Sequence, residues 1–260
     1  MFHPPAPLVS ELEKRLKDAP QISLFLDFDG TLAPITADPD TTALEPRMTA
    51  TLNRLSHQQP LVTTVISGRA IEDLYSRIRL SSLIYAGNHG LEIFGRGLRF
   101  VEPSASARRV PLERLCEELV ARLRPVPGVN VEFKGLTASI HYRRAAEADL
   151  GLVQQTVYAA TAQHGDLFRI VPGRKVFDIV PRTNWHKGAA VQWINNELGE
   201  PAPVTIYLGD DTTDEDAFSV LPDAITIKVG NAPVTCARYQ LPGPAAVHEF
   251  LEWLSIRLQN

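Results

Sequence analysis

The sequence predicts an α/β protein in which a doubly wound parallel sheet is interrupted by an inserted α+β domain. Near both ends of the chain, short apolar runs alternate with amphipathic helical segments, an order typical of parallel sheets. Between these two parts the order of elements changes to αββαββ, which predicts an antiparallel sheet with helices on one face. We therefore expect a core formed by residues 1–103 and 181–260, and an inserted domain at 104–180.

The first part of the core contains three apolar runs that end at glycine or polar residues, as buried parallel strands do. In the first helix, Ser10 is a candidate N-cap and Glu13 follows three residues later, which is the spacing of a capping box. The expected elements are helices at 8–19, 48–56 and 70–79, strands at 22–26, 61–66 and 83–86, and a hairpin of 91–94 with 98–101.

The inserted domain follows a Pro-Ser-Ala-Ser segment at 103–106, which is typical of a linker. Within the insertion we expect helices at 111–123 and 145–164 and strands at 129–133, 136–143, 167–171 and 175–180. The α/β order then resumes with helices at 186–198, 214–220 and 245–259 and strands at 204–208 and 224–229.

Composition argues against several classes of protein. The 260 residues carry a net charge of −4, with no basic arm for nucleic acid and no apolar run of transmembrane length. A secretory signal is not visible at the N-terminus, and Cys116 and Cys236 lack metal-ligand spacing. We expect a cytoplasmic monomer that binds neither nucleic acid nor a membrane. Residues 104–180 carry a net charge of +3 and the rest −7, a division that suits an anionic substrate held between the two parts.

Two aspartates, Asp27 and Asp29, end the first buried strand in the string ISLFLDFDGTL. Ligands of open α/β sheets bind at the carboxyl ends of the strands, and two carboxylates there cannot both stay ionised without a cation or a proton. Turn formation is an alternative role for the pair. A calcium-binding EF-hand loop is excluded, because Thr31 and Leu32 stand where that loop needs Asp or Asn and then Gly. The pair therefore predicts a metal site.

Polar residues also follow the other strands that are expected to end at this edge. Ser67 and Gly68 offer a hydroxyl and an accessible backbone N–H that could hold a phosphate oxygen, and Asn88 with His89 follows the third strand. Asp210 and Asp211 follow the strand at 204–208, where carboxylates could complete a Mg²⁺ site. Further acidic residues from Asp214 on suit the first turn of a helix.

Lys187 is expected in the first turn of the helix at 186–198, where the positive end of the helix disfavours a cation. A lysine is tolerated there if an anion binds at the same place, because both the helix N-terminus and the ammonium group attract phosphate. The alternative is a surface lysine whose stem covers apolar groups.

Together these motifs resemble those of the haloacid-dehalogenase (HAD) type phosphatases: DFDGTL with Asp27 and Asp29, then Ser67, Lys187, and the acidic string from Gly209. Longer strings are similar to those of the trehalose-6-phosphate phosphatases. These are SGR from Ser67, YAGNHGLE from Tyr85, EFKGLTASIHYR from Glu132, GRKVFDIVP from Gly173, WHKGAAV from Trp185 and YLGDDTTDEDAF from Tyr207. The resemblance implies a Rossmann-like core, with the insertion at 104–180 as a cap of the C2 type.

The resemblance also implies a mechanism. Asp27 would be the nucleophile that forms an aspartyl-phosphate, and Asp29 the general acid and base. Mg²⁺ would be bound by Asp27, by the backbone carbonyl of Asp29 and by Asp210. Ser67, Gly68 and Lys187 would hold the phosphoryl group. Asp211 and Asp214 would support the metal ligands.

The substrate implied by the resemblance is a small sugar phosphate, trehalose 6-phosphate. The implied sugar-binding residues are Arg69, Asn88, His89, Glu132, Lys134, Arg174, Lys175 and Asp178. The family usually has Glu where Asp178 stands, and Phe133 occupies a position expected to be polar. Sucrose phosphate and a glycosyl-phosphoglycerate are alternative substrates. A non-catalytic sugar-phosphate-binding module is a further alternative, although such a module should have lost one of the core carboxylates, and all are present here.

Overall fold

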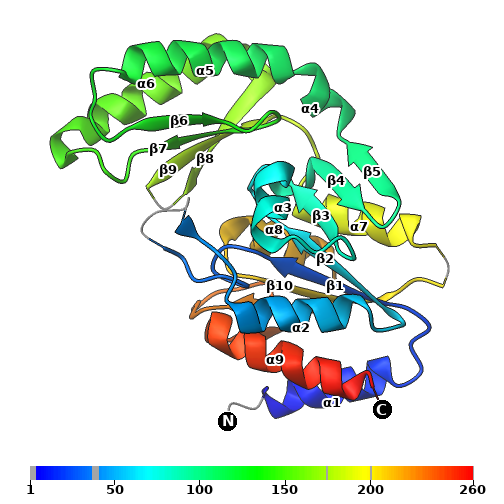
Figure 1. Cartoon of the computed structure of the whole chain (residues 1–260). Coiled ribbons are helices and arrows are strands. Elements are labelled where there is room, and N and C mark those ends of the chain that lie inside the picture. The colour runs from blue at the N-terminus through cyan, green and yellow to red at the C-terminus, as the bar shows by residue number, and fades with distance from the viewer. Residues whose placement is uncertain (1–3, 37–40, 174, 200, 260) are drawn as a thin grey trace. The chain divides into compact units, whose positions relative to one another are not determined.

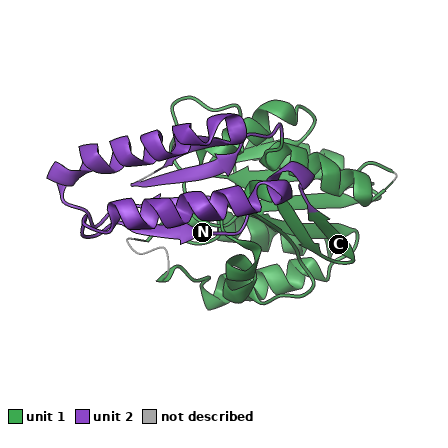
Figure 2. Cartoon of the chain, turned by 90° about the horizontal axis from the view of Figure 1, so that it is seen from above, with its two compact units in different colours: residues 1–100, 185–260 green, residues 101–184 purple. Residues whose placement is uncertain are grey.

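The structure is a computed structural model that describes residues 4–36, 41–173, 175–199 and 201–259. It divides into two compact units, which Figure 2 shows in different colours. Unit 1 consists of Met1–Phe100 and Trp185–Asn260, and unit 2 consists of Val101–Asn184. The chain therefore passes from unit 1 to unit 2 and back, with the two crossings close to the expected positions 103/104 and 180/181.

Unit 1 is built on one sheet with the strand order β12-β11-β10-β1-β2-β3-β4-β5. The strands from β12 to β3 pair in parallel, and β4 joins β3 in the antiparallel direction. This confirms the predicted parallel α/β sheet. The strands are β1 (Ile22–Asp27), β2 (Leu61–Ile66), β3 (Ile84–Gly87), β4 (Glu92–Gly95), β5 (Leu98–Val101), β10 (Val204–Gly209), β11 (Ile225–Val229) and β12 (Tyr239–Leu241).

Helices cover both faces of this sheet, as the apolar clusters and Figure 1 show. One cluster joins the sheet to α1, α2, α3 and α9, and the other joins it to α7 and α8. A sheet buried on both faces explains why its strands are continuous apolar runs. The helices are α1 (Ala6–Leu16), α2 (Pro46–Ser56), α3 (Ile71–Ile78), α7 (Lys187–Glu197), α8 (Thr212–Val220) and α9 (Pro244–Arg257), and a 3₁₀ turn, η2, spans Asn88–Gly90.

Strand β1 lies at the centre of this sheet, between β10 and β2, and all six of its residues are buried. Leu26 pairs with Leu208 of β10, and Asp27 pairs with Ile66 of β2. Because the three strands run in parallel, the residues that follow each of them emerge at the same edge of the sheet. This register sets the positions of the candidate site.

Unit 2 contains an antiparallel sheet with the order β6-β7-β9-β8. Its apolar cluster joins the sheet to α5 and α6, as the αββαββ pattern predicts. The elements are α4 (Pro103–Ala107), α5 (Arg109–Leu123), β6 (Asn130–Phe133), β7 (Ala138–His141), η3 (Glu147–Asp149), α6 (Leu150–Gln163), η4 (Gly165–Leu167), β8 (Phe168–Gly173) and β9 (Val176–Pro181). Among the described residues of either unit, no helix has the length and apolar character needed to cross a bilayer.

Two expectations about local structure are wrong, and one strand was not predicted. The capping box of Ser10 and Glu13 does not form, because α1 already begins at Ala6 with a proline in its first turn. The linker expected at 103–106 is the helix α4, which is capped by Glu102, whose carboxylate accepts the Ala105 N–H at 2.6 Å. Strand β12 was not expected, because a run of three residues carries too little pattern to be recognised. The other predicted helices and strands occur where expected, most of them with shifted ends.

Neighbouring residues of α5 allow a direct test of the packing in unit 2. Leu119 is fully buried in the apolar cluster, whereas Val120 has 51% of its surface exposed. We expect Leu119→Ala to lower the free energy of unfolding by about 2–5 kcal/mol, because it removes buried methyl groups and leaves a cavity. Val120→Ala, the control, should change it by less than about 0.5 kcal/mol. Urea denaturation of both variants measures the difference, and equal effects would contradict this packing.

Candidate active site

A buried lysine joins two aspartates at the carboxyl edge of the unit 1 sheet. The Lys187 ammonium donates hydrogen bonds to Asp27 Oδ1 and to Asp214 Oδ1, both at 2.7 Å. The exposed fractions of the three side chains are 2% for Lys187, 7% for Asp27 and 0% for Asp214. Lys187 begins α7, Asp27 ends β1, and Asp214 lies in the first turn of α8. Charges buried this deeply are tolerated only when they are paired and hydrogen-bonded.

Asp214 is held in place by partners on both of its oxygens. Oδ1 also accepts the Tyr207 hydroxyl at 2.7 Å, and Oδ2 accepts the Asp211 N–H at 2.9 Å as part of a capping box. A Cβ atom at residue 209 would lie 2.2 Å from the carboxyl carbon of Asp214, so only glycine leaves room for it. Asp214 therefore serves as a fixed partner for Lys187.

A second glycine, Gly30, leaves the space that the Asp210 carboxylate occupies. Gly30, just after β1, has a φ of +85°, and a Cβ atom there would lie 2.1 Å from Asp210 Oδ2. The Thr31 hydroxyl lies 3.5 Å from Asp210 Oδ1. The Asp210 carboxylate thus packs against the turn that follows Asp27, which explains the need for glycine at position 30.

Burial makes this group of charges unstable when no cation is bound. Burial raises the pKa of Asp27 well above its usual range, and burial together with nearby Asp214 raises the pKa of Asp210 to about 7. Burial alone would lower the pKa of Lys187, but Asp214 and Asp27 raise it well above its usual value. One ammonium group cannot neutralise three neighbouring carboxylates, so this edge of the sheet must take up a proton or a cation.

The donor set fits a hard divalent cation such as Mg²⁺. Asp27, Asp210 and Asp214 each offer one oxygen, and these oxygens lie within 4.8 Å of one another. Mg²⁺ binds carboxylate oxygens and keeps several waters, so two carboxylates are sufficient protein ligands. Asp214 already accepts three hydrogen bonds. Asp27 and Asp210 are therefore the two side chains best placed to hold the metal.

Asp29 faces a different partner. Both of its oxygens accept hydrogen bonds from Arg69, from Nε and from Nη2, each at 2.7 Å. Arg69 Nη1 also donates to Asp73 at 2.9 Å, and the guanidinium lies over the Phe28 ring, 5.4 Å from its centre. This fork-like pairing fixes the direction of the Asp29 carboxylate. Arg69, expected to bind the sugar, contacts Asp29 in this structure.

The turns after β2 and β3 lie side by side and bring Ser67, Gly68, Asn88 and His89 together. Ser67 Oγ accepts the Arg69 N–H at 3.2 Å, and the His89 N–H donates to the Ser67 carbonyl at 2.8 Å. Asn88 and His89 both adopt left-handed backbone conformations, with φ values of 50° and 60°. A Cβ atom at position 68 would lie 2.6 Å from the His89 ring, so the ring packs directly on Gly68. Backbone strain of this kind is typical of functional sites.

The other sugar-binding candidates lie in unit 2. Glu132 is in β6 and Asp178 in β9, and Lys134 Nζ lies 3.9 Å from Glu132 Oε2. Lys175 is exposed in the turn between β8 and β9, and Arg174 lies outside the described residues. Phe133 packs against the apolar cluster of unit 2, which explains the absence of a polar residue at this position.

Two residues at the core site were missed by sequence reasoning. Tyr207 supports Asp214, and Lys228, in β11, donates to the Asp210 carbonyl at 2.7 Å and lies 3.2 Å from Glu215 Oε1. Both stand inside apolar strand runs. A tyrosine hydroxyl or a lysine in such a run needs a buried partner, and this is the signal that could have identified them.

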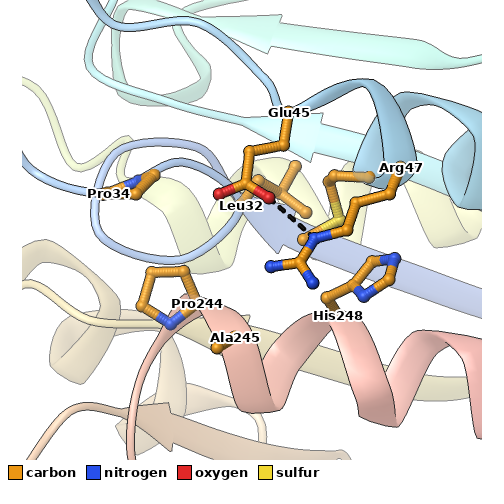
Figure 3. Close-up of a pocket in the computed structure, with 8 residues that line it drawn as sticks. Leu32, Pro34, Glu45, Arg47, Pro244, Ala245 and His248 are labelled. Carbon is orange, nitrogen blue, oxygen red and sulfur yellow. Dashed lines mark hydrogen bonds and ion pairs between the residues drawn. The ribbon is translucent and has the colours of Figure 1, made fainter.

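A separate cavity of about 250 Å³ lies between α2 and α9 (Figure 3). Its wall is largely apolar, and at its rim Glu45 accepts a hydrogen bond from Arg47 at 2.7 Å. None of the predicted site residues contributes to the lining formed by the described residues, which are Leu32, Pro34, Glu45, Arg47, Met48, Pro244, Ala245 and His248. This cavity is therefore distinct from the acidic edge of the sheet.

The fold and the acidic edge define a class of protein. The structure resembles a haloacid dehalogenase-like hydrolase from Bacteroides thetaiotaomicron, with a TM-score of 0.64, 17% identity and coverage of 90% of this chain and 99% of that one. It resembles the C-terminal domain of Candida albicans trehalose-6-phosphate phosphatase with a TM-score of 0.82, 24% identity and coverage of 97% and 98%. These likenesses show the fold, which is that of the HAD-like hydrolases, and they confirm the predicted fold class.

The sequence places the chain within that class. Residues 25–243 match the model of the trehalose-phosphatase family. A trehalose-phosphate phosphatase from Mycobacterium tuberculosis is 37% identical over 251 residues, covering 93% of this chain and 63% of the relative. A probable trehalose-phosphate phosphatase H from Arabidopsis thaliana is 34% identical over 278 residues, covering 98% and 79%. The chain therefore belongs to the trehalose-phosphatase family, as its motifs predicted, and it spans 63% of the length of the mycobacterial relative.

The raised pKa values predict how stability depends on pH in the absence of metal. The raised pKa of Asp210, about 7 against 3.8, means that the folded state binds more protons than the unfolded state between these values. In EDTA, the free energy of unfolding should therefore fall as the pH rises from about 5 to about 7, by roughly 1.4 kcal/mol per pH unit for each proton involved. Denaturation at several pH values measures this slope.

Mg²⁺ should reverse this effect, because it replaces the protons on the same carboxylates. We expect a larger Mg²⁺-induced rise in Tm at about pH 8 than at about pH 6, and a much smaller rise in Asp210→Asn. Asp216→Asn, which changes an exposed carboxylate of α8, is the matched control and should keep the full rise. A metal response that survives in Asp210→Asn would contradict the assignment of Asp210 as a ligand.

Proposed function

We propose that this chain is a Mg²⁺-dependent phosphatase that hydrolyses trehalose 6-phosphate to trehalose and phosphate through an aspartyl-phosphate. The observation that supports this most strongly is the buried contact of Lys187 with Asp27 and Asp214, in a chain that matches the trehalose-phosphatase family over residues 25–243. The names of the relatives at 37% and 34% identity support the same substrate.

In the first half of the reaction, an oxygen of Asp27 attacks the phosphorus atom. The bond between phosphorus and the sugar oxygen breaks, and Asp29 gives its proton to the departing oxygen. In the second half, Asp29 takes a proton from a water molecule, which attacks the phosphorus atom. The bond to Asp27 then breaks, and phosphate is released.

The contact between Arg69 and Asp29 sets a condition on these steps. In the bidentate arrangement both Asp29 oxygens accept hydrogen bonds, which suits the ionised form of this carboxylate. A protonated oxygen donates its hydrogen and is a weaker acceptor, so protonation of Asp29 favours the release of one oxygen by Arg69 before Asp29 acts as an acid. Substrate binding would supply the new partners that make this release favourable.

The phosphoryl group is held by charge and by hydrogen bonds. Lys187 and the Ser67 hydroxyl are the proposed ligands of its oxygens, together with the backbone at Gly68, so the contribution of the chain is mainly positioning and electrostatics. When bound by Asp27 and Asp210, Mg²⁺ would mask the negative charge that otherwise repels the phosphate from the nucleophile. Lys228, behind the Asp210 carbonyl, would keep this ligand in place.

Unit 2 is proposed to act as the cap that recognises the sugar. Its sheet carries Glu132 and Asp178, and Lys134 lies close to Glu132. Carboxylates and amines at fixed positions can reject sugars whose hydroxyl groups do not match. Lys175, in the turn between β8 and β9, and Arg174 are the remaining candidates for this role.

Removal of the nucleophile provides a test of the covalent mechanism. Asp27→Asn should lower kcat on the order of 10⁴-fold or more, because an amide does not form the phosphoryl intermediate. The fold should survive, since Lys187 keeps Asp214 as a partner and one surplus carboxylate is removed. Phosphate release measures the activity and circular dichroism the fold, with Asp216→Asn as the active control. Substantial turnover in folded Asp27→Asn would rule out Asp27 as the nucleophile.

A panel of phosphate esters tests the substrate. Phosphate release should be compared for trehalose 6-phosphate, sucrose 6-phosphate and glucose 6-phosphate. We expect kcat/KM to be at least about 100-fold higher for trehalose 6-phosphate, because an ester that leaves buried polar groups unpaired is strongly rejected. Equal rates would leave the phosphatase chemistry but remove the specific substrate, and no turnover of any ester would favour a binding module.

A further inference from the structure

The face of the unit 2 sheet that lies opposite α5 and α6 carries both proposed sugar-binding carboxylates. The apolar cluster beneath α5 and α6 takes up alternate residues of β6, β7 and β9. The side chains of Glu132, Ser139 and Asp178 therefore lie on the opposite face. In the register of the sheet, Glu132 stands opposite Ser139, and Ser139 stands opposite Asp178. His141, two residues further along β7, lies on the same face.

The central strand of this row, β7, contacts both carboxylates. The Ser139 hydroxyl donates a hydrogen bond to Asp178 Oδ1, and His141 Nε2 lies 2.9 Å from Glu132 Oε2. An ionised carboxylate only accepts hydrogen bonds, so Nε2 of His141 carries the hydrogen in this contact. Each carboxylate is thus held by a donor from the neighbouring strand, and neither donor was among the residues expected from the sequence.

We propose that Ser139 and His141 are positioning residues that orient Asp178 and Glu132 to accept hydrogen bonds from hydroxyl groups of the sugar. The inference rests on the proposed function and assigns two further residues to it. A carboxylate already fixed by one donor loses little rotamer freedom when a ligand binds, so it binds more tightly than a free side chain. A fixed direction also makes the site selective, because only a sugar with matching hydroxyl positions reaches the acceptor.

The length of Asp178 fits this arrangement. Asp178 stands directly opposite Ser139 in the paired strands, and its short side chain brings Oδ1 within reach of the Ser139 hydroxyl. Among the described residues, Ser139 donates to Oδ1, which leaves Oδ2 for a ligand. Glu132 has a longer side chain. It contacts His141, which lies two residues beyond Ser139 on β7 and therefore diagonally across the two strands. The short Asp178 side chain is thus paired with a donor directly opposite it, and the longer Glu132 side chain with a donor at the diagonal position.

Three variants test the proposal in the full chain. Ser139→Ala removes the hydroxyl, His141→Phe keeps a ring but removes the donor, and His141→Gln keeps an amide donor at a similar reach. His164→Phe is the matched control, because this residue lies at the end of α6, where its ring contacts Phe168. Steady-state kcat and KM are measured with trehalose 6-phosphate and with p-nitrophenyl phosphate, which has no sugar, and circular dichroism checks the fold.

We expect Ser139→Ala and His141→Phe each to raise KM for trehalose 6-phosphate about tenfold, the usual effect of losing a hydrogen bond to a charged group, with a smaller change in kcat. The ratio of kcat/KM for trehalose 6-phosphate to that for p-nitrophenyl phosphate should fall by a similar factor. His141→Gln should recover most of the loss, and His164→Phe should resemble the wild type.

The possible outcomes distinguish a failure of this inference from a failure of the proposed function on which it rests. If the wild type prefers trehalose 6-phosphate and both Ser139→Ala and His141→Phe keep that preference, the inference is wrong and the proposed function stands. Equal losses with both substrates also overturn it, because they indicate a structural role. A wild type that does not prefer trehalose 6-phosphate overturns the proposed function and the inference together.

Discussion

The Lys187 ammonium group, buried between Asp27 and Asp214, is the interaction on which the core site depends. The three residues come from β1 (Asp27), α7 (Lys187) and α8 (Asp214), which are far apart in the chain. The parallel sheet brings them together at one of its edges. Removing the lysine would leave two buried carboxylates without their shared cation, so the position of Lys187 constrains the other two. Glycine is needed at positions 30 and 209 because the carboxylates of Asp210 and Asp214 fill the space that a side chain would need.

The two units hold their carboxylates in the same physical way. In unit 1 the Tyr207 hydroxyl contacts Asp214, and Lys228 of β11 contacts the Asp210 backbone. In unit 2, Ser139 and His141 of β7 contact carboxylates of the strands on either side. In each case a donor on a strand fixes an acidic group beside it. A sheet suits this purpose, because its register sets the distance between neighbouring side chains more firmly than a loop does.

The sequence predicted which side chains lie at the ends of the strands, but not which of them form hydrogen bonds with one another. Asp27, Ser67 and Asp210 could be grouped because parallel strands end at one edge, whatever their side chains do. The pairing of Asp29 with Arg69 could not be foreseen, because the guanidinium could have turned to other acceptors and only packing selects among its rotamers. The Glu102 cap was missed for a related reason, since Pro-Ser-Ala-Ser is typical of a linker until a neighbouring carboxylate satisfies the first turn.

The position of β1 between β2 and β10 has a consequence for biosynthesis. One edge of β1 can pair with β2 soon after both leave the ribosome, but its other edge pairs with residues 204–208, which are made only after the whole of unit 2. During that interval the nascent chain presents an apolar strand with unsatisfied backbone groups, the kind of edge that associates with other chains. The strand that carries Asp27 thus precedes every other strand of its sheet in the chain, but it gains its second neighbour only after β10 has been made.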